Sequence, residues 1–207
     1  MHKNQGVEFY ERHAITLAEE YEAVSFENAY PFLVQVLSGE PIKILDIGAG
    51  TGRDAAWIAA HGHDVCAVEP SAAMRKIAKF LHPNKRITWV DSRLPVLQAA
   101  ILKPNTFDIV LAHAVWMHIA PEEREHSMRR IRELLNNKGT AYVSLRIGPQ
   151  DEQRGMFSVS SNEFVALAKT AGFKVVHRGD FPDLLGRMEI SWKMYELKKF
   201  YKGIFRF

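Results

Sequence analysis

Hydrophobic and polar positions follow two different periods along the chain. Residues 7–38 repeat apolar side chains every three or four positions, as an amphipathic helix does. From residue 42 onward, short apolar runs alternate with longer segments of helical periodicity, which predicts a parallel sheet with helices on both faces. The predicted strands are 42–47, 64–68, 87–90, 107–112, 140–147, 173–177 and 189–197, and the predicted helices are 52–61, 71–81, 95–102, 122–136 and 161–171.

The last two predicted strands have no helix between them. The segment 179–187 that joins them is short and carries Pro182 and Gly186, which are typical of turns. Because a short connection joins antiparallel neighbours, we expect the final strand to run against the others. The predicted fold is an α/β three-layer sandwich in which residues 1–40 form an N-terminal helical cap and residues 41–207 form a single globular unit.

Composition narrows the class of protein. The 207 residues are 47% hydrophobic and carry a formal net charge of +3, which suits one globular domain and gives no clear nucleic-acid signature. The single cysteine, Cys66, excludes an internal disulfide and a cysteine-built zinc site, and the histidines lack metal-ligand spacing. No apolar run reaches transmembrane length and no signal core is present, so we expect a cytoplasmic protein without a metal.

The segment 44–54, which reads ILDIGAGTGRD, combines a buried strand, a turn with three glycines and the start of a helix. Glycine lets the backbone turn tightly and approach a ligand closely, because it has no Cβ. The helix that follows points its free N–H groups at the turn. Asp46 ends the strand, and a buried carboxylate there needs a cationic partner or the N–H groups of the turn, whereas a pyrophosphate would be repelled.

Two more carboxylates end the next two predicted strands. Glu69 can accept hydrogen bonds from both hydroxyls of a ribose, and Asp91 can accept one from an adenine amino group with Leu94 beside the ring. In open sheets of this type the ligand lies at the carboxyl ends of the strands. Together with Asp46, these residues favour an adenosine ligand that lacks phosphates and has a positively charged amino-acid end.

In their order and spacing, these motifs resemble those of the class I S-adenosylmethionine-dependent methyltransferases. The matching segments are LDIGAGTGRD at 45–54, AVEPS at 67–71 with Met74, DSRLP at 91–95, FDIV at 107–110, WMHI at 116–119 and LLNNKGT at 134–140. The resemblance implies a Rossmann-like, seven-stranded sheet of order 3-2-1-4-5-7-6 with a reversed last strand. It also implies that Gly48 and Gly50 line the methionine part of S-adenosylmethionine, that Glu69 holds the ribose, and that Asp91 with Ser92 faces the adenine.

Other residues are candidates for the same site. Pro70 and Tyr10 are predicted cofactor contacts, Tyr10 because the N-terminal region often closes over the cofactor in the resembled family; plain packing against the core is the alternative. Arg53 would contact the cofactor carboxylate or the acceptor, or lie on a helix surface, and Asp54 is expected only to complement the helix dipole. His113 follows strand four and would touch the cofactor, act as a general base, or form a wall of the pocket.

The resemblance implies transfer of a methyl group from S-adenosylmethionine to O, N or another nucleophile by in-line displacement, with S-adenosylhomocysteine as the product. Because the sulfonium makes the methyl group electrophilic, catalysis requires mainly alignment and exclusion of water. The acceptor surface is expected to come from the N-terminal helices and residues 113–120, 146–158 and 179–187, a mixed lining that suits a small molecule rather than a nucleic acid or a membrane. Two alternatives stay open: a cofactor-binding accessory or regulatory protein without transfer activity, and an NAD-dependent oxidoreductase, which Asp46 and the glycine spacing disfavour.

Overall fold

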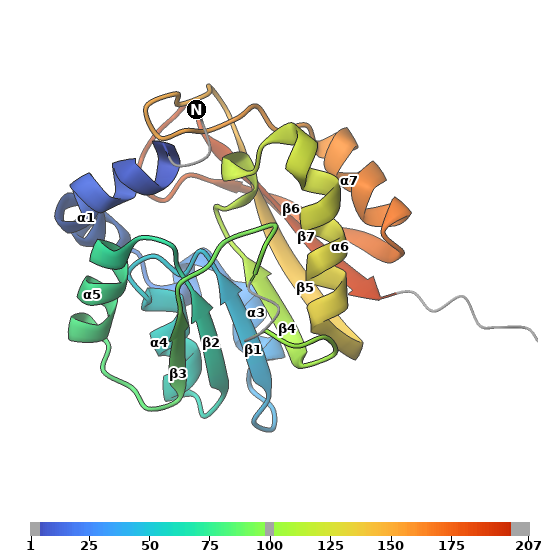
Figure 1. Cartoon of the computed structure of the whole chain (residues 1–207), viewed down its shortest axis with the longest axis horizontal. Helices are drawn as coiled ribbons and strands as arrows, with labels where there is room; N and C mark the ends of the chain where they lie inside the picture. The colour runs from blue at the N-terminus through green and yellow to red at the C-terminus, as the bar shows by residue number, and fades with distance from the viewer. Residues whose placement is uncertain (1–4, 98–101, 200–207) are drawn as a thin grey trace, which may run out of the picture.

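The computed structural model of the chain describes residues 5–97 and 102–199. Its centre is a seven-stranded sheet in the order β3-β2-β1-β4-β5-β7-β6 (Figure 1). The strands are β1 (Lys43–Ile47), β2 (Asp64–Val68), β3 (Ile87–Val90), β4 (Phe107–Ala112), β5 (Leu135–Ile147), β6 (Phe173–Pro182) and β7 (Ser191–Lys199). The first five pair in parallel, and β7 is antiparallel to both β5 and β6. The predicted strand order and the reversed last strand are confirmed.

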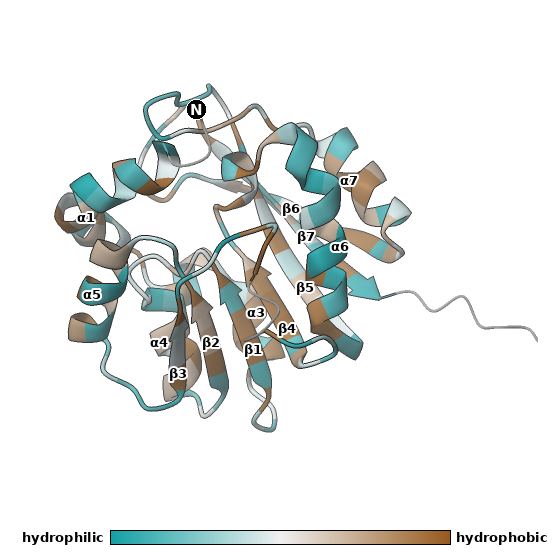
Figure 2. Cartoon of the chain, viewed as in Figure 1, coloured by the Kyte–Doolittle hydropathy of each residue, from teal (hydrophilic) through white to brown (hydrophobic). Residues whose placement is uncertain are grey.

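Helices cover both faces of this sheet. On one face lie α2 (Phe26–Ala29), α3 (Pro31–Val36) and α4 (Arg53–Ala60), and on the other lie α6 (Arg124–Leu134) and α7 (Ser161–Thr170). Successive side chains of a strand point to opposite faces, so Ile44 of β1 joins the first core and Leu45 the second. Figure 2 shows this division as hydrophobic strands inside helices whose outer surfaces are largely hydrophilic.

The N-terminal segment is helical, as predicted, but its three helices take different places. Phe26 and Leu33, from α2 and α3, are buried in the core of the sheet together with Leu37. By contrast, α1 (Gln5–Glu22) packs on α5 (Ala72–Leu81), where Leu17 meets Met74. Figure 1 shows α1 at the end of the sheet where the parallel strands finish. This places α1 over the edge at which a ligand is expected.

The start of β5 differs from the prediction. The apolar stripe predicted a helix as far as residue 136, but α6 ends at Leu134 and β5 begins at Leu135. Leu135 pairs with Phe107, and after an irregularity the ladder resumes with Thr140 opposite Ile109. Residues 135 and 136, which the helical periodicity assigns to the preceding helix, therefore belong to β5, because this strand pairs with β4 from Leu135 onward.

Two other segments also differ. β6 does not end at residue 177 but continues to Pro182, with an irregularity between His177 and Gly179 where it pairs with β7. The predicted helix over 95–102 is a turn over residues 94–96, and residues 98–101 of that prediction lie outside the described residues. The connection after β6 is thus shorter than expected, and it continues directly from an extended strand.

Within residues 5–97 and 102–199, no helix combines the length and the apolar character needed to cross a bilayer. In the same residues, no three His, Cys, Asp or Glu side chains gather in a way that could hold a metal ion. Among the described residues, the 3-10 helices η2 (Trp116–His118) and η3 (Pro121–Glu123) follow β4 and lead into α6.

Candidate active site

A cavity of about 750 Å³ lies at the carboxyl ends of the central strands, beneath α1. The strand order reverses between β1 and β4, which is the point at which open α/β sheets bind ligands. The wall combines α1, the glycine turn after β1, the ends of β2, β4 and β5, the loop after β5 and the turn between β6 and β7. The predicted cofactor residues that line it are Tyr10, Asp46, Gly48, Gly50, Arg53, Glu69, Pro70, Ser92, Leu94 and His113.

Asp91 does not belong to this wall. Its side chain is 67% exposed and forms an ion pair of 2.8 Å with Arg75 of α5. The same guanidinium donates to the main-chain oxygen of Glu69 at 2.5 Å, so Arg75 ties the ends of β2 and β3 together. Ser92 and Leu94, which are buried, line the cavity on this side. In this structure the Asp91 carboxylate faces Arg75 and solvent, and its contact with an adenine stays a prediction.

The glycine turn is shaped for a close approach of backbone to ligand. Gly48 and Gly50 have φ angles of 71° and 55°, in the left-handed region that favours glycine. A Cβ on Gly48 would lie 2.6 Å from a methyl carbon of Val115, whereas a Cβ on Gly50 would have no protein atom within 4 Å. Gly48 is thus required by packing, and Gly50 presents its backbone to the open space of the cavity.

Glu69 holds this turn in place from the end of β2. Its Oε2 accepts a hydrogen bond from the Gly50 N–H at 2.9 Å, and its Oε1 accepts one from the Ser71 N–H at 2.8 Å. Burial raises the pKa of the Glu69 carboxyl, and the two backbone hydrogen bonds oppose that rise. Each carboxylate oxygen can accept a further hydrogen bond. The two carboxylate oxygens of Glu69 are therefore suited to accept hydrogen bonds from two neighbouring hydroxyls, as on a ribose.

Asp46 has a buried carboxylate that the protein leaves without a full set of partners. The residue is 3% exposed, and its Oδ2 has no hydrogen-bond partner within residues 5–97 and 102–199. Burial raises the pKa of Asp46, and the nearby charge of Asp54 raises it further. Because buried carboxylates are normally paired, this oxygen is suited to a cationic group of a ligand. The residues of this end thus fit a ligand with a ribose and a positively charged part.

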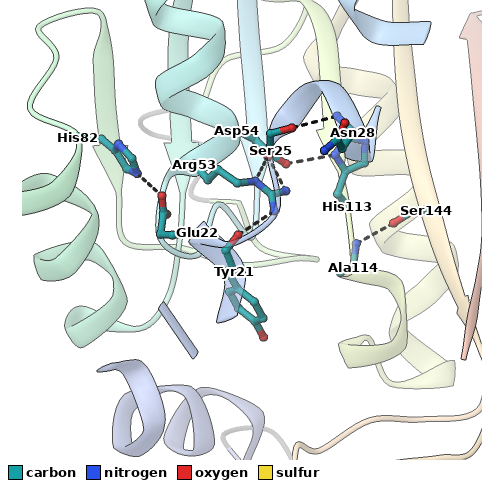
Figure 3. A network of polar contacts seen from close by, with 10 residues as sticks. All are labelled: Tyr21, Glu22, Ser25, Asn28, Arg53, Asp54, His82, His113, Ala114 and Ser144. Carbon is teal, nitrogen blue, oxygen red and sulfur yellow. Dashed lines mark hydrogen bonds and ion pairs between the residues drawn. The ribbon is translucent and has the colours of Figure 1, made fainter. Parts of the chain in front are cut away.

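Arg53 is already engaged within the protein. Its Nη2 lies 2.7 Å from Oδ1 of Asp54, and its Nη1 donates to the main-chain oxygen of Tyr21 at 3.1 Å (Figure 3). Arg53 thereby joins the start of α4 to the end of α1. Although it lines the cavity, its hydrogen bonds in this structure serve to position α1 and Asp54.

His113 sits at the carboxyl end of β4 with an environment that sequence reasoning missed. It is 7% exposed, and its ring stacks on Tyr30 with 3.9 Å between centroids. Its Nδ1 lies 3.5 Å from Oδ2 of Asp54 (Figure 3). Among the described residues, neither ring nitrogen meets a hydrogen-bond partner. Asp54 therefore faces His113 across the cavity in addition to its place in the first turn of α4. Asp54 and His113 come close because the strand order places α4 beside β4. In the sequence, the only indication of this contact is that an acidic residue follows Arg53.

At the α1 side of the cavity, Tyr10 meets His118. The Tyr10 hydroxyl lies 3.1 Å from His118 Nε2. Burial, followed by the charge of Arg154, lowers the pKa of His118 to about 4, so the imidazole is neutral near pH 7 and the phenol can donate to it. Burial also raises the pKa of Tyr10 well above its ordinary value. Tyr10 thus links α1 to the 3-10 helix after β4.

Comparison with known proteins gives one family over the central part of the chain. A sequence profile described as "Methyltransferase domain" matches residues 45–143. An uncharacterized methyltransferase of Oceanobacillus iheyensis is 32% identical over 123 residues, which are 58% of this chain and 54% of that protein. The chain thus spans about half the length of this relative.

Solved structures share the fold at lower sequence identity. Phosphoethanolamine N-methyltransferase 2 of Haemonchus contortus, in complex with phosphomonomethylethanolamine and S-adenosylhomocysteine, is 19% identical with a TM-score of 0.69, covering 93% of this chain and 59% of that one. The 1,6-didemethyltoxoflavin-N1-methyltransferase of Burkholderia thailandensis, with bound 1,6-didemethyltoxoflavin and S-adenosylhomocysteine, is 19% identical with a TM-score of 0.65, covering 91% and 90%. At these identities the likeness concerns the fold.

Proposed function

We propose that this chain, which belongs to the class I S-adenosylmethionine-dependent methyltransferase family, binds S-adenosylmethionine at the strand ends and transfers its methyl group to a small molecule. The observation that carries the proposal is the unpartnered, buried carboxylate oxygen of Asp46 in a cavity that also exposes the Gly50 backbone and the Glu69 carboxylate. Such a cavity favours an adenosine ligand with a cationic end over one with a pyrophosphate.

The residues of this chain would hold the ligand by its two ends. Glu69 would accept hydrogen bonds from the ribose hydroxyls, and Ser92 and Leu94 would face the base. Asp46 would attract the positively charged amino-acid end, and Gly50 would allow it to approach the backbone closely. The bound cofactor supplies a methyl group made electrophilic by a sulfonium. The work left to the protein is to align a nucleophile and exclude water, which can lower the barrier by roughly 7–11 kcal/mol.

His113 is the residue we propose as general base. An acceptor hydroxyl or ammonium group must lose a proton, and a base placed within hydrogen-bond reach contributes about 10²–10⁴-fold. With Nδ1 turned toward Asp54, the buried His113 Nε2, which has no hydrogen-bond partner among the described residues, would accept that proton. Asp54, held by Arg53, would act as a positioning residue for the imidazolium. A His113→Gln variant should therefore lose about 10²–10⁴-fold in rate, while its affinity for S-adenosylhomocysteine stays within about twofold of that of the wild type.

A small-molecule acceptor is supported by the size and walls of the site. The cavity is of the size usual for small-ligand sites and is bordered by α1, the loop after β5 and the turn between β6 and β7. Two proteins of the same fold have small molecules bound beside S-adenosylhomocysteine. These observations support a small molecule over a duplex or a folded protein as the acceptor.

Calorimetry with S-adenosylhomocysteine tests the cofactor assignment. Wild-type protein should bind it, and Glu69→Gln should bind at least about tenfold more weakly, because hydrogen bonds to a charged carboxylate are worth about 1.5–3 kcal/mol. Glu125→Gln, on the exposed side of α6, is the control and should bind as the wild type does. NADH binding without S-adenosylhomocysteine binding would instead favour the oxidoreductase.

A labelled-methyl assay tests transfer separately. Protein, S-adenosylmethionine carrying a tritiated methyl group and a small-molecule extract are incubated, and labelled products are separated by chromatography. Transfer predicts a labelled product that requires the protein and disappears with excess S-adenosylhomocysteine. Tight cofactor binding without any labelled product would favour the accessory or regulatory alternative.

A further inference from the structure

Three arginines line the cavity on the side away from the glycine turn. Arg146 lies at the end of β5, Arg154 in the loop that follows, and Arg187 in the turn between β6 and β7. Their charges act on the same groups: Arg154 and Arg187 both lower the pKa of the Tyr21 hydroxyl against the effect of burial. This side of the cavity therefore carries guanidinium groups from three separate segments.

Two of these arginines have carboxylate partners. Arg187 forms a fork with Asp183, with distances of 2.9 Å from Nε to Oδ2 and 2.6 Å from Nη2 to Oδ1. Asp183 also accepts from the Trp192 indole at 3.0 Å, which fixes the turn. Arg154 pairs with Asp151 at 3.3 Å. These two pairs place guanidinium groups on the wall without a large net charge.

Arg146 is different because no carboxylate lies within ion-pair distance of it among the described residues. Its Nη1 donates to the main-chain oxygen of Pro149, and its Nε is buried without a hydrogen-bond partner. Burial lowers the pKa of Arg146, and Arg187 and Arg154 lower it further, with Asp151 and Asp183 opposing them. Arg146 is thus a cation at the wall of the cavity that the charges of Arg187 and Arg154 repel and whose Nε lacks a hydrogen-bond acceptor among the described residues.

The two sides of the cavity have opposite character. The cofactor side carries Asp46, Asp54 and Glu69 against Arg53, whereas on the other side Arg154 and Arg187 have carboxylate partners and Arg146 has none within ion-pair distance among the described residues. Glu122 and Glu123 also line the cavity, at the 3-10 helix before α6. Arg146 and Tyr21 both line this cavity, and a guanidinium group and a phenol can each donate a hydrogen bond to an oxyanion.

Resting on the proposed function, we infer that the methyl acceptor is an anion, with a carboxylate or phosphate group that binds Arg146 beside Arg154 and Arg187. Bound in this way, the acceptor is drawn into the cavity by its charge and held at one end. Its nucleophilic atom is then directed toward the strand ends. The inference concerns the acceptor alone, and the cofactor site does not depend on it.

The test uses inorganic phosphate and acetate as probes. Protein saturated with S-adenosylhomocysteine is titrated with each anion at constant ionic strength, with chloride as the reference. We compare wild type, Arg146→Gln and the control Arg129→Gln, which removes the same charge from the exposed face of α6. Binding of at least one anion, weakened at least tenfold by Arg146→Gln and unchanged by Arg129→Gln, supports the inference. Preference for phosphate or for acetate then identifies the acidic group.

Two results overturn the inference. Neither anion binds the wild type more tightly than chloride does, or Arg146→Gln binds the preferred anion as tightly as wild type. The affinity of Arg146→Gln for S-adenosylhomocysteine should equal that of the wild type, which shows that the variant is folded and its cofactor site intact. Failure of the wild type to bind S-adenosylhomocysteine would overturn the proposed function instead, and the anion titration is then read on the unloaded protein.

Discussion

Replacing Asp46 with asparagine is expected to stabilise the free protein and to weaken cofactor binding. Asp46 is buried, its Oδ2 lacks a hydrogen-bond partner, and the charge of Asp54 opposes its ionisation. A buried polar group without a partner costs about 1–3 kcal/mol, and more when it is charged. Asparagine keeps the shape without the charge, so the free energy of unfolding should rise by about 1–3 kcal/mol near neutral pH. For a chain of this size the melting temperature should rise by about 2–12 °C.

The pH dependence gives this gain a distinct signature. Burial raises the pKa of Asp46, so the folded protein keeps this proton to a higher pH than the unfolded chain does. The corresponding stability is fully present below the unfolded pKa of about 3.9 and is lost as pH rises through the folded pKa. The asparagine variant lacks this loss. The difference between the two proteins should therefore be small near the unfolded pKa and grow as pH rises toward the folded pKa.

Cofactor binding should change in the opposite direction. Loss of hydrogen bonds to a charged group removes about 1.5–3 kcal/mol, which weakens binding about 10- to 150-fold. Calorimetry with both S-adenosylmethionine and S-adenosylhomocysteine locates the partner, because only the former carries the sulfonium charge. Equal losses point to the amino group, and a larger loss for S-adenosylmethionine points to the sulfonium.

Denaturant unfolding followed by tryptophan fluorescence measures the stability of the Asp46 variant. Asp64→Asn is the matched control: Asp64 is exposed at the start of β2, paired with Arg86, and its loss should change stability by less than about 0.5 kcal/mol. The reasoning is refuted if Asp46→Asn is less stable than wild type at neutral pH, or if it binds both ligands as tightly as wild type does.

Three further predictions follow from the same site. Gly50→Ala should lower the free energy of unfolding by about 1–2 kcal/mol because of its left-handed φ, and should weaken S-adenosylhomocysteine binding more than tenfold because its Cβ enters the open space, as calorimetry would measure. The pKa of His118 is lowered to about 4 in the folded protein, so the protein loses stability as pH falls below the pKa of about 6.5 that His118 has in the unfolded chain. Between about pH 7.5 and about pH 5, the free energy of unfolding should therefore fall by about 2 kcal/mol more in the wild type than in His118→Gln, as denaturant unfolding would measure. Glu11 accepts hydrogen bonds from the Ser71 hydroxyl at 2.6 Å and from the Ala73 N–H at 3.1 Å. Glu11→Gln should therefore loosen the contact of α1 with α5 and speed proteolytic cleavage within α1, and saturating S-adenosylhomocysteine should restore protection. An unchanged cleavage rate would contradict this role.

Much of the fold could be predicted because several strands are isolated apolar runs. β2, β3 and β4 have the predicted bounds, since turn residues end each run and one buried face continues through it. The ends of β5 and β6 could not be predicted in this way. Leu135 continues the apolar stripe of α6 but pairs with Phe107, a partner that becomes visible only when the sheet is assembled. Local periodicity therefore fails where a strand partner competes with a helix.

The cofactor side of the site follows from strand ends, and the exceptions arise from contacts across elements. Glu69 and Asp91 occupy the same position on neighbouring strands, yet Arg75 of α5 draws Asp91 toward solvent. Asp54 approaches His113 because α4 and β4 are brought together by strand order. Neither effect is visible from the spacing of residues within one motif.

Two residues that break ordinary rules of stability lie at one cavity. Among the described residues, Asp46 is buried with an oxygen that has no hydrogen-bond partner, and Arg146 keeps a buried Nε without an acceptor. Each feature weakens the free protein, and each is relieved by a ligand group of defined chemistry, a cation for Asp46 and an anion for Arg146. A ligand present at about a hundred times its dissociation constant adds about 2.7 kcal/mol to stability, an amount similar to one such defect. The same cavity that destabilises the empty protein therefore specifies its ligands, and a substitution that stabilises the free protein there should weaken binding.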